Sequence, residues 1–119
     1  MMKKPIVIER DVTLADAAKL MVKHSISSLL VLFDNKIAGI ITYEDLVRHF
    51  GEQKKVSEVM TRQVITVKSF EKVQVIIDLI SEKHISTVPV VDRAGKLVGV
   101  VHMKDIITEV CTNDEFLME

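Results

Sequence analysis

The sequence predicts a mixed α/β fold of the α+β type, in which one β-α-β-β-α unit occurs twice. A length of 119 residues suits one compact module and is short for two independent cores. The composition, 48% hydrophobic but only 4% aromatic, predicts an aliphatic core. The third observation is an internal repeat with a spacing of 59 residues: Ile6, Leu20, Ile26, Ser27 and Val31 recur as Ile65, Leu79, Ile85, Ser86 and Val90.

The repeat continues beyond these positions after a one-residue insertion in the second copy. The residues that recur at a spacing of 60 are Lys36, Gly39 and Asp45, matched by Lys96, Gly99 and Asp105. We expect a single module over 1–119, with repeat one at 5–50 and repeat two at 56–112. A unit of about 50 residues buries too little surface to be secure alone, so the copies are expected to share a core. The polar stretch 51–59 is too short to be a flexible linker.

Each element of the first copy has its own local signal. The β-branched run 6–8 predicts a strand, and apolar residues at helical spacing between Leu14 and Met21 predict a core helix. Strands are expected at 29–33 and 37–41, joined by a short, turn-rich segment that favours a hairpin. A closing helix is expected over 43–50.

The second copy repeats this order. A strand is expected at 64–67, and the apolar stripe between Val73 and Ile80 predicts a core helix. Strands at 88–91 and 97–101 form the second expected hairpin, and a closing helix is expected over 103–110.

Charge and cysteine content narrow the class of protein. Sixteen Lys and Arg against seventeen Asp and Glu give a net charge of −1, which argues against nucleic acid as the main partner. The single cysteine, Cys111, cannot form an internal disulfide, and no apolar segment follows the N-terminal lysines as in a secretion signal. The longest apolar stretches have five residues, against the roughly 20 that cross a bilayer. We expect a cytoplasmic protein without a membrane span.

Both copies close their hairpin with a Gly and an Asp six residues apart, and a polar residue lies between them. In the first copy Thr42 and Asp45 have the spacing of a capping box, worth about 1 kcal/mol of helix stability. In the second copy His102 is a poor cap, and yet Asp105 is present. The alternative is a ligand site, because a helix N-terminus favours an anion and an ionised Asp accepts hydrogen bonds from a diol. Phosphate plus ribose would satisfy both requirements.

These features together resemble the CBS-domain family. The tandem units, the lead-in 56–61, the strand region 85–92 and the two closures Gly-x-x-(Thr/His)-x-x-Asp look like a CBS pair, also called a Bateman module, over essentially the whole chain. The resemblance implies two repeats related by pseudo-twofold symmetry, with clefts between them. Each cleft would bind an adenosine-containing effector such as AMP, ADP, ATP or S-adenosylmethionine.

The resemblance also implies which residues would bind the effector. In one cleft Asp45 would hold the ribose and Thr42 the phosphate. The adenine would lie against the other repeat, near Thr61, Ile65, Ile85, Ser86 and Pro89. The second cleft would use Asp105 and His102, with Ile6, Ile26 and Ser27. His102 departs from the usual Ser or Thr, so it either makes phosphate binding dependent on pH or fills the junction and blocks the cleft.

No other motif indicates catalysis or a metal. The sequence has no nucleophile with an evident base partner, no phosphate-binding glycine loop, and no zinc-like spacing among its four His and one Cys. We therefore expect no enzyme, no cofactor and no metal site. The leading hypothesis is an adenosine-ligand sensor, a homodimer through its closing helices, that acts in trans on an unidentified regulated protein. The alternative is a ligand-free dimerisation or scaffold module.

Overall fold

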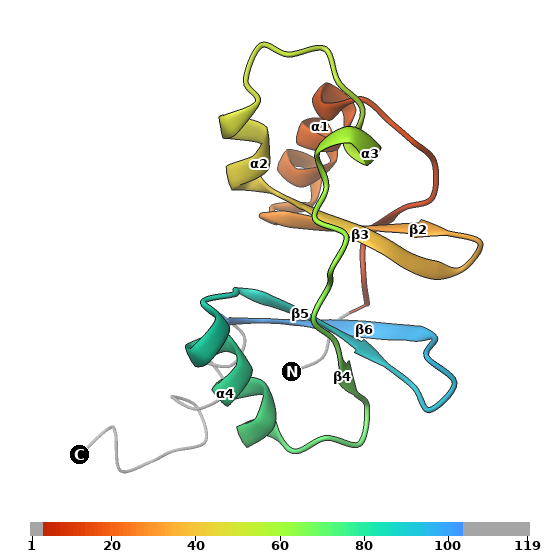
Figure 1. The fold of residues 1–119 in the computed structure, drawn as a ribbon, viewed down its shortest axis with the longest axis vertical. Helices are drawn as coiled ribbons and strands as arrows, with labels where there is room; N and C mark the ends of the chain where they lie inside the picture. The colour runs from red at the N-terminus through yellow and green to blue at the C-terminus, as the bar shows by residue number, and fades with distance from the viewer. Residues whose placement is uncertain (1–3, 104–119) are drawn as a thin grey trace. The chain divides into compact units, whose positions relative to one another are not determined.

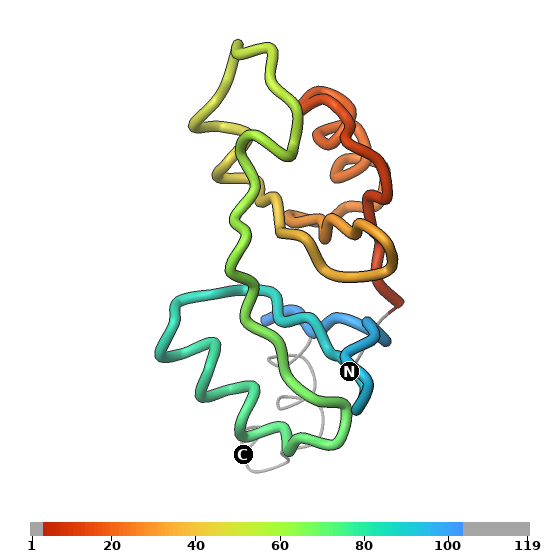
Figure 2. Tube along the Cα trace, turned by 45° about the vertical axis from the view of Figure 1, so that its right-hand side comes forward, coloured from red at the N-terminus to blue at the C-terminus, as the bar shows by residue number. Residues whose placement is uncertain are grey.

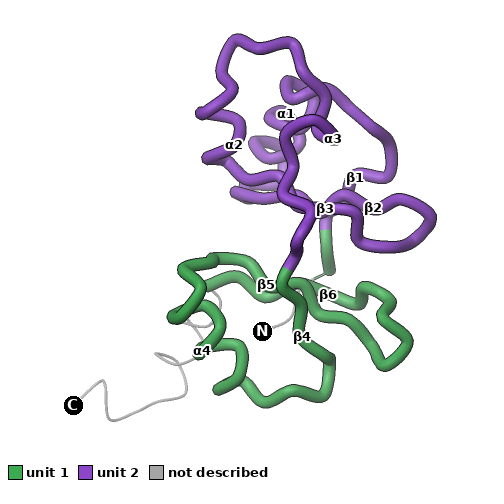
Figure 3. The backbone as a smooth tube through the Cα atoms, in the orientation of Figure 1, with its two compact units in different colours: residues 1–5, 65–119 green, residues 6–64 purple. Residues whose placement is uncertain are grey.

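The computed structural model describes residues 4–103 and divides the chain into two compact units (Figure 3). The first unit is residues 6–64, and the second unit is residues 65–119 together with residues 1–5. The path of the chain through each unit can be followed in Figure 2. Each unit has its own three-stranded mixed sheet, which confirms the predicted α/β class and the repeated hairpin.

The helices of the first unit lie on one face of its sheet (Figure 1). Its elements are β1 (Val7–Ile8), α1 (Leu14–His24), β2 (Ser28–Phe33), β3 (Lys36–Thr42), α2 (Tyr43–Arg48) and α3 (Val56–Val59). The strand order is β1-β2-β3, with β1 parallel and β3 antiparallel to β2. The strand, helix and hairpin predictions hold here, while α3 was not predicted.

Local chemistry sets the limits of α1. The Thr13 side chain accepts a hydrogen bond from the backbone N–H of Asp16 at 3.1 Å, which caps the first turn. At the other end Ser25 adopts a left-handed conformation with φ of 53°, and its N–H reaches the carbonyl of Val22 at 3.2 Å. The helix therefore begins and ends at residues that satisfy its free backbone groups.

The turn between β2 and β3 is tight. Asp34 and Asn35 both have positive φ, at 53° and 63°, and Phe33 pairs with Lys36 across the turn. Two central residues with positive φ match the twist of antiparallel strands, and Asp and Asn tolerate this conformation better than most residues. The turn thus fixes the register of the hairpin.

The second unit repeats the arrangement with shifted ends. Its described elements are β4 (Val67–Lys68), α4 (Val73–Lys83), β5 (Thr87–Val91) and β6 (Leu97–His102), in the strand order β4-β5-β6. The strand expected at 64–67 is largely wrong, because regular pairing with β5 begins only at Val67. The closing helix expected over 103–110 lies, apart from Met103, outside the described residues.

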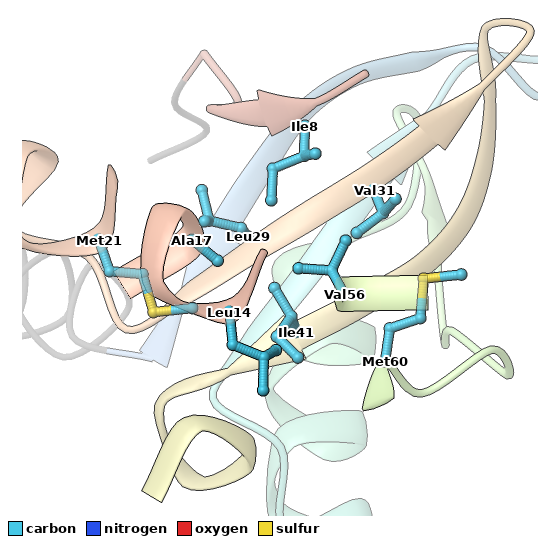
Figure 4. Close-up of a cluster of buried hydrophobic side chains, with 9 residues drawn as sticks. All are labelled: Ile8, Leu14, Ala17, Met21, Leu29, Val31, Ile41, Val56 and Met60. Carbon is cyan, nitrogen blue, oxygen red and sulfur yellow. The ribbon is translucent and has the colours of Figure 1, made fainter. Parts of the chain in front are cut away.

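The core of the first unit lies between its sheet and its helices (Figure 4). Leu29 and Val31 of β2 and Ile41 of β3 point towards the helices, as alternation along a strand requires. The buried cluster comprises Ile8, Leu14, Ala17, Met21, Leu29, Val31, Ile41, Val56 and Met60. In the second unit the corresponding cluster comprises Val67, Ile76, Ile80, Val88, Val90 and Val101. Both are aliphatic cores, as the composition predicted.

The segment between the repeats is bound to the first unit. The N–H of Leu14 donates to the carbonyl of Lys54 at 3.0 Å, and the N–H of Val56 donates to the carbonyl of Val12 at 2.9 Å. Val56 is fully buried and Met60 nearly so. The expectation that 51–59 is not a flexible linker agrees with these contacts.

Candidate functional site

The junction of β3 and α2 contains the capping box that the sequence suggested. Oδ2 of Asp45 accepts a hydrogen bond from the N–H of Thr42 at 2.8 Å and another from its hydroxyl at 2.9 Å. In return the N–H of Asp45 donates to Oγ1 of Thr42 at 3.3 Å. The capping interpretation is therefore confirmed for the first repeat. The capping box does not exclude a ligand role for Thr42 and Asp45, because side chains that cap a helix can also contact a ligand.

The second carboxylate oxygen of Asp45 has a weaker partner. Nη1 of Arg48 lies 3.6 Å from Oδ1, and the Arg48 side chain is largely exposed. Asp45 itself is only 8% exposed. Since a carboxylate offers about four acceptor directions, Oδ1 can accept further hydrogen bonds while Oδ2 holds the cap. The carboxylate is thus fixed in place by its own helix.

Pairing across the sheet brings further polar residues to the same face as Thr42. Ser28 lies opposite Thr42 on β2, and directly opposed residues share one face of a sheet. On the other side of β3, Thr61 and Ile40 exchange both backbone hydrogen bonds at 2.9 Å. Ile40 and Thr42 are two residues apart, so Thr61 belongs to this face as well. This face is the one opposite the buried Ile41.

Ser28 is a polar residue at this face that was not among the predicted site residues, whereas its neighbour Ser27 was predicted for the second cleft. Ser28 is buried, whereas Ser27 is exposed, and the Ser27 carbonyl accepts the N–H of Tyr43 at 2.8 Å. The available signal was the hairpin register, because a strand alternates its faces and a shift of one residue reverses them.

The remaining predicted residues of the first unit pack against its core. Ile6 and Ile26 are half-buried and contact the hydrophobic cluster. Ile26 also lines an apolar groove of about 300 Å³ between α1 and α2. Within the first unit, the structure thus brings Thr42, Asp45 and Thr61 to one end of β3 and places the two isoleucines in packing positions.

The second unit has a different polar pair at the equivalent place. Thr87 lies opposite His102, and Oγ1 of Thr87 is 2.9 Å from Nδ1 of His102. The Ser86 carbonyl accepts a hydrogen bond from the N–H of Met103 at 2.7 Å, just as the Ser27 carbonyl accepts one from the N–H of Tyr43. The backbone of the junction is therefore repeated while its side chains differ.

The other predicted residues of this unit lie along the strands. Ile85 packs against the second core cluster, and Pro89 is fully buried on β5, where it pairs with Val100 of β6. Ile65 is half-buried. Asp105 lies outside the described residues.

Two carboxyl groups of the first unit have displaced pKa values, and both lie away from Asp45 in the sequence. The hydrogen bond from the Ser57 side chain, more than any other contact, lowers the pKa of Asp11. The hydrogen bond with His49 is the largest cause of a lowered pKa at Glu52. Both groups therefore favour their charged form in the folded protein.

Residues 4–103 contain neither a cluster of metal ligands nor a membrane-spanning helix. Within that range no group of three or more His, Cys, Asp and Glu side chains gathers as a metal site would require. None of the helices in the same range has the length and apolar character needed to cross a bilayer.

Comparison with known proteins shows which family the chain belongs to. The model of the CBS domain matches residues 1–52 and 56–111. Among solved structures, the chain is similar to the CBS domain pair of protein MJ0100 in complex with 5′-methylthioadenosine and S-adenosyl-L-methionine, with 34% identity and a TM-score of 0.87 over 94% of this chain and 92% of that one. A putative signal-transduction protein with CBS domains from Burkholderia ambifaria is 28% identical, with a TM-score of 0.85 over 98% of this chain and 89% of that one.

The similar curated proteins include enzymes that are much longer than this chain. The L-aspartate semialdehyde sulfurtransferase of Methanocaldococcus jannaschii is 38% identical over 87% of this chain, and the inosine-5′-monophosphate dehydrogenase of the same organism is 31% identical over 88%. In both cases the chain spans 21% of the length of the enzyme.

Proposed function

The chain belongs to the CBS-domain family, and we propose that it is a regulatory module that binds an adenosine-containing ligand and acts on a partner protein. The observation that carries the proposal is the likeness, at 34% identity, to a CBS domain pair in complex with two adenosine compounds. The candidate ligands are AMP, ADP, ATP and S-adenosylmethionine. The module itself has no catalytic role in this proposal, in keeping with its match to only a fifth of the related enzymes.

The first unit supplies the polar groups that such a ligand requires. Asp45 is the proposed ribose acceptor, since Oδ1 can take hydroxyl hydrogen bonds while Oδ2 remains bound to Thr42. Thr42 is the proposed phosphate donor. Its hydroxyl now donates to Asp45, so it must rotate to meet a phosphate, while the backbone N–H of Thr42 keeps the carboxylate in place. The adenine would contact Thr61.

The family resemblance assigns further residues to the proposed sites. For the adenine of the first site these are Ile65, Ile85, Ser86 and Pro89. For the second site they are His102, Asp105, Ile6, Ile26 and Ser27. Each of these assignments remains a proposal.

A thermal-shift panel with the four candidate ligands tests the proposal, with GTP as the control for the base. A ligand at about 100 times its Kd adds roughly 2.7 kcal/mol to the native state, which is several degrees in Tm for a domain of this size. We expect at least one adenosine ligand to produce this shift and calorimetry to give a micromolar Kd. Unchanged Tm with the whole panel at millimolar concentration would reject the ligand role.

A ligand-free dimerisation or scaffold module is the second candidate. One observation favours it, because Thr42 and Asp45 already satisfy each other in the capping box and so have a structural role without any ligand. A negative result from the thermal-shift panel would leave this function as the better explanation of the two side chains.

We further propose that the protein is a homodimer, which both candidate functions would use. Phe50 is 90% exposed beside the groove between α1 and α2, whose rim also carries the exposed Val22 and Val47. Light scattering at tens of micromolar is expected to give twice the 13.4 kDa of the chain. Phe50→Ser is expected to shift the mass towards the monomer, and Phe70→Ser, which changes an exposed phenylalanine of the second unit, is not.

A further inference from the structure

Asp11 and Ser57 form the main side-chain contact between the start of the first unit and the segment that follows α2. Oδ2 of Asp11 accepts the Ser57 hydroxyl at 2.7 Å, and Oδ1 accepts the Ser57 backbone N–H at 3.1 Å. The two residues are 46 positions apart in the sequence. The Ser57 carbonyl in turn accepts a hydrogen bond from Nη2 of Arg62 at 3.0 Å. Every polar group of Ser57 therefore has a partner.

Helix α3 requires such contacts because it has only four residues. An isolated helix of fewer than about 12 residues is marginal in water, so α3 depends on tertiary contacts. Val56 and Met60 bury their side chains in the core. Burial of two apolar groups is not directional, whereas the hydrogen bonds that Ser57 donates from its N–H and its hydroxyl to the Asp11 carboxylate fix the orientation of the first turn.

The segment then passes very close to β3 and pairs with it. A Cβ placed on Gly39 would lie 2.6 Å from the Met60 sulfur and 2.9 Å from the Thr61 carbonyl oxygen, so only glycine leaves room for this approach. Beyond Met60, the two backbone hydrogen bonds between Thr61 and Ile40 extend the sheet at its edge. The position of Thr61 thus depends on how α3 is held.

We infer that Asp11 is a positioning residue for the proposed ligand site: through Ser57 it orients α3 and so holds Thr61 at the edge of β3, on the face of Thr42. Asp11 itself does not contact the ligand in this arrangement. The consequence for ligand binding rests on the proposed function. The consequence for the backbone of Thr61 does not, so the two parts can be tested separately.

The experiment compares Asp11→Ala, Asp11→Asn and Ser57→Ala with the parent by amide hydrogen exchange without ligand. In Asp11→Ala we expect the amides of Thr61 and Ile40 to exchange roughly tenfold faster, while those of Leu29 and Val31 in β2 keep their rate. Asp11→Asn keeps one acceptor oxygen and is expected to fall between parent and alanine. Asp16→Ala removes an exposed carboxylate of the same unit and is the matched control, expected to leave both rates unchanged.

Calorimetry with AMP and with S-adenosylmethionine then tests the ligand part. We expect Asp11→Ala to weaken binding about three- to tenfold and Asp16→Ala to leave it unchanged. Unchanged exchange at Thr61 and Ile40, or a uniform increase at all amides, would overturn the positioning role. Faster exchange with unchanged affinity would overturn its link to the ligand. A parent that binds none of AMP, ADP, ATP and S-adenosylmethionine would defeat the proposed function, and the exchange rates would still decide how Thr61 is held.

Discussion

The ends of the two hairpins have the same backbone and different side chains. Ser28 lies opposite Thr42 in the first unit, and Thr87 lies opposite His102 in the second. In both units the next residue of the chain donates its N–H to the serine carbonyl that precedes the first strand of the hairpin, at 2.8 Å and 2.7 Å. The repeated sequence thus places a polar residue at the same point twice.

What the two polar residues do there is different. Thr42 forms a capping box with Asp45 of its own helix, while His102 bonds across the strands to Thr87. A hydroxyl stays neutral at every accessible pH, whereas an imidazole can take up a proton and become positively charged. A duplicated backbone can therefore keep a polar residue at the same position while the chemistry of its side chain differs between the two copies.

Substitution of the aspartate in each repeat is expected to cause the largest loss of ligand affinity. Asp45→Asn removes the charged acceptor of the first repeat, and loss of a charge-assisted hydrogen bond costs about 1.5 to 3 kcal/mol of binding, or roughly ten- to hundredfold in Kd. Stability without ligand is expected to change little, because Thr42 remains the N-cap and the amide oxygen of an asparagine can still accept the backbone N–H of Thr42. Calorimetry and thermal unfolding of the same sample measure both quantities.

The parallel variant Asp105→Asn shows whether the second repeat has an equal site. Equal losses in the two variants would mean that the repeats bind alike. The opposite pattern for Asp45→Asn, with lower stability and unchanged binding, would leave Asp45 with only its capping role.

Gly39→Ala is expected to have the next largest effect. The added Cβ meets the Met60 sulfur and the Thr61 backbone, and overpacking of this kind costs about 1 to 3 kcal/mol of unfolding free energy. The comparison variant is Gly95→Asn in the second unit, where open space surrounds the glycine and only its φ of 86° causes strain, which Asn tolerates better than most residues, so a smaller loss is expected. Urea unfolding of both variants gives the difference, and equal stabilities would contradict the close approach at Gly39.

A smaller, severalfold change of ligand affinity with pH is expected at the second repeat, where His102 lies. If the second repeat binds a phosphate, its affinity should rise from about pH 8 to about pH 6 as the imidazole gains charge. The Thr87 hydroxyl permits this, because it can donate to a neutral ring nitrogen or accept from a protonated one. His102→Thr is expected to abolish the extra pH response in calorimetry.

The same variant tests the competing interpretation that His102 blocks the site. A blocked site would open in His102→Thr and raise the number of ligands bound per chain. Two equal sites in the parent with the same pH response would contradict both interpretations.

The smallest effect concerns acid stability of the first unit. The pKa of Asp11 is lowered in the folded state, chiefly by Ser57, so its contribution is complete above the unfolded value and is lost as pH falls through the folded value. Between about pH 5 and about pH 2.5 the parent should lose slightly more unfolding free energy than Asp11→Asn. Urea unfolding at several pH values measures this slope, and an equal slope in the two proteins would contradict the lowered pKa of Asp11.

Elements with a local signal could be predicted from the sequence. The apolar runs 29–33 and 37–41 and the turn residues between them define the first hairpin. Thr42 and Asp45 are three residues apart, so the capping box is visible without any tertiary information.

Features that depend on distant residues could not be predicted. Helix α3 has only four residues, too few to show a helical period, and Asp11, which binds it, lies 46 residues from Ser57. The β-branched residues at 64–66 favoured a strand, but the pairing that defines β4 begins at Val67, where β5 offers a partner. The face of Ser28 followed from the hairpin register, which a list of polar residues does not contain.

The burial of Met60 also affects how the methionines of the protein react with peroxide. Met60 is 7% exposed with its sulfur against Gly39, whereas Met103 is 44% exposed. A sulfoxide oxygen would have no space at Gly39, so peroxide can reach Met60 only when α3 leaves the sheet, while Met103 reacts in the folded state. A sulfoxide at Met60 therefore marks those molecules in which α3 has opened at least once while peroxide was present.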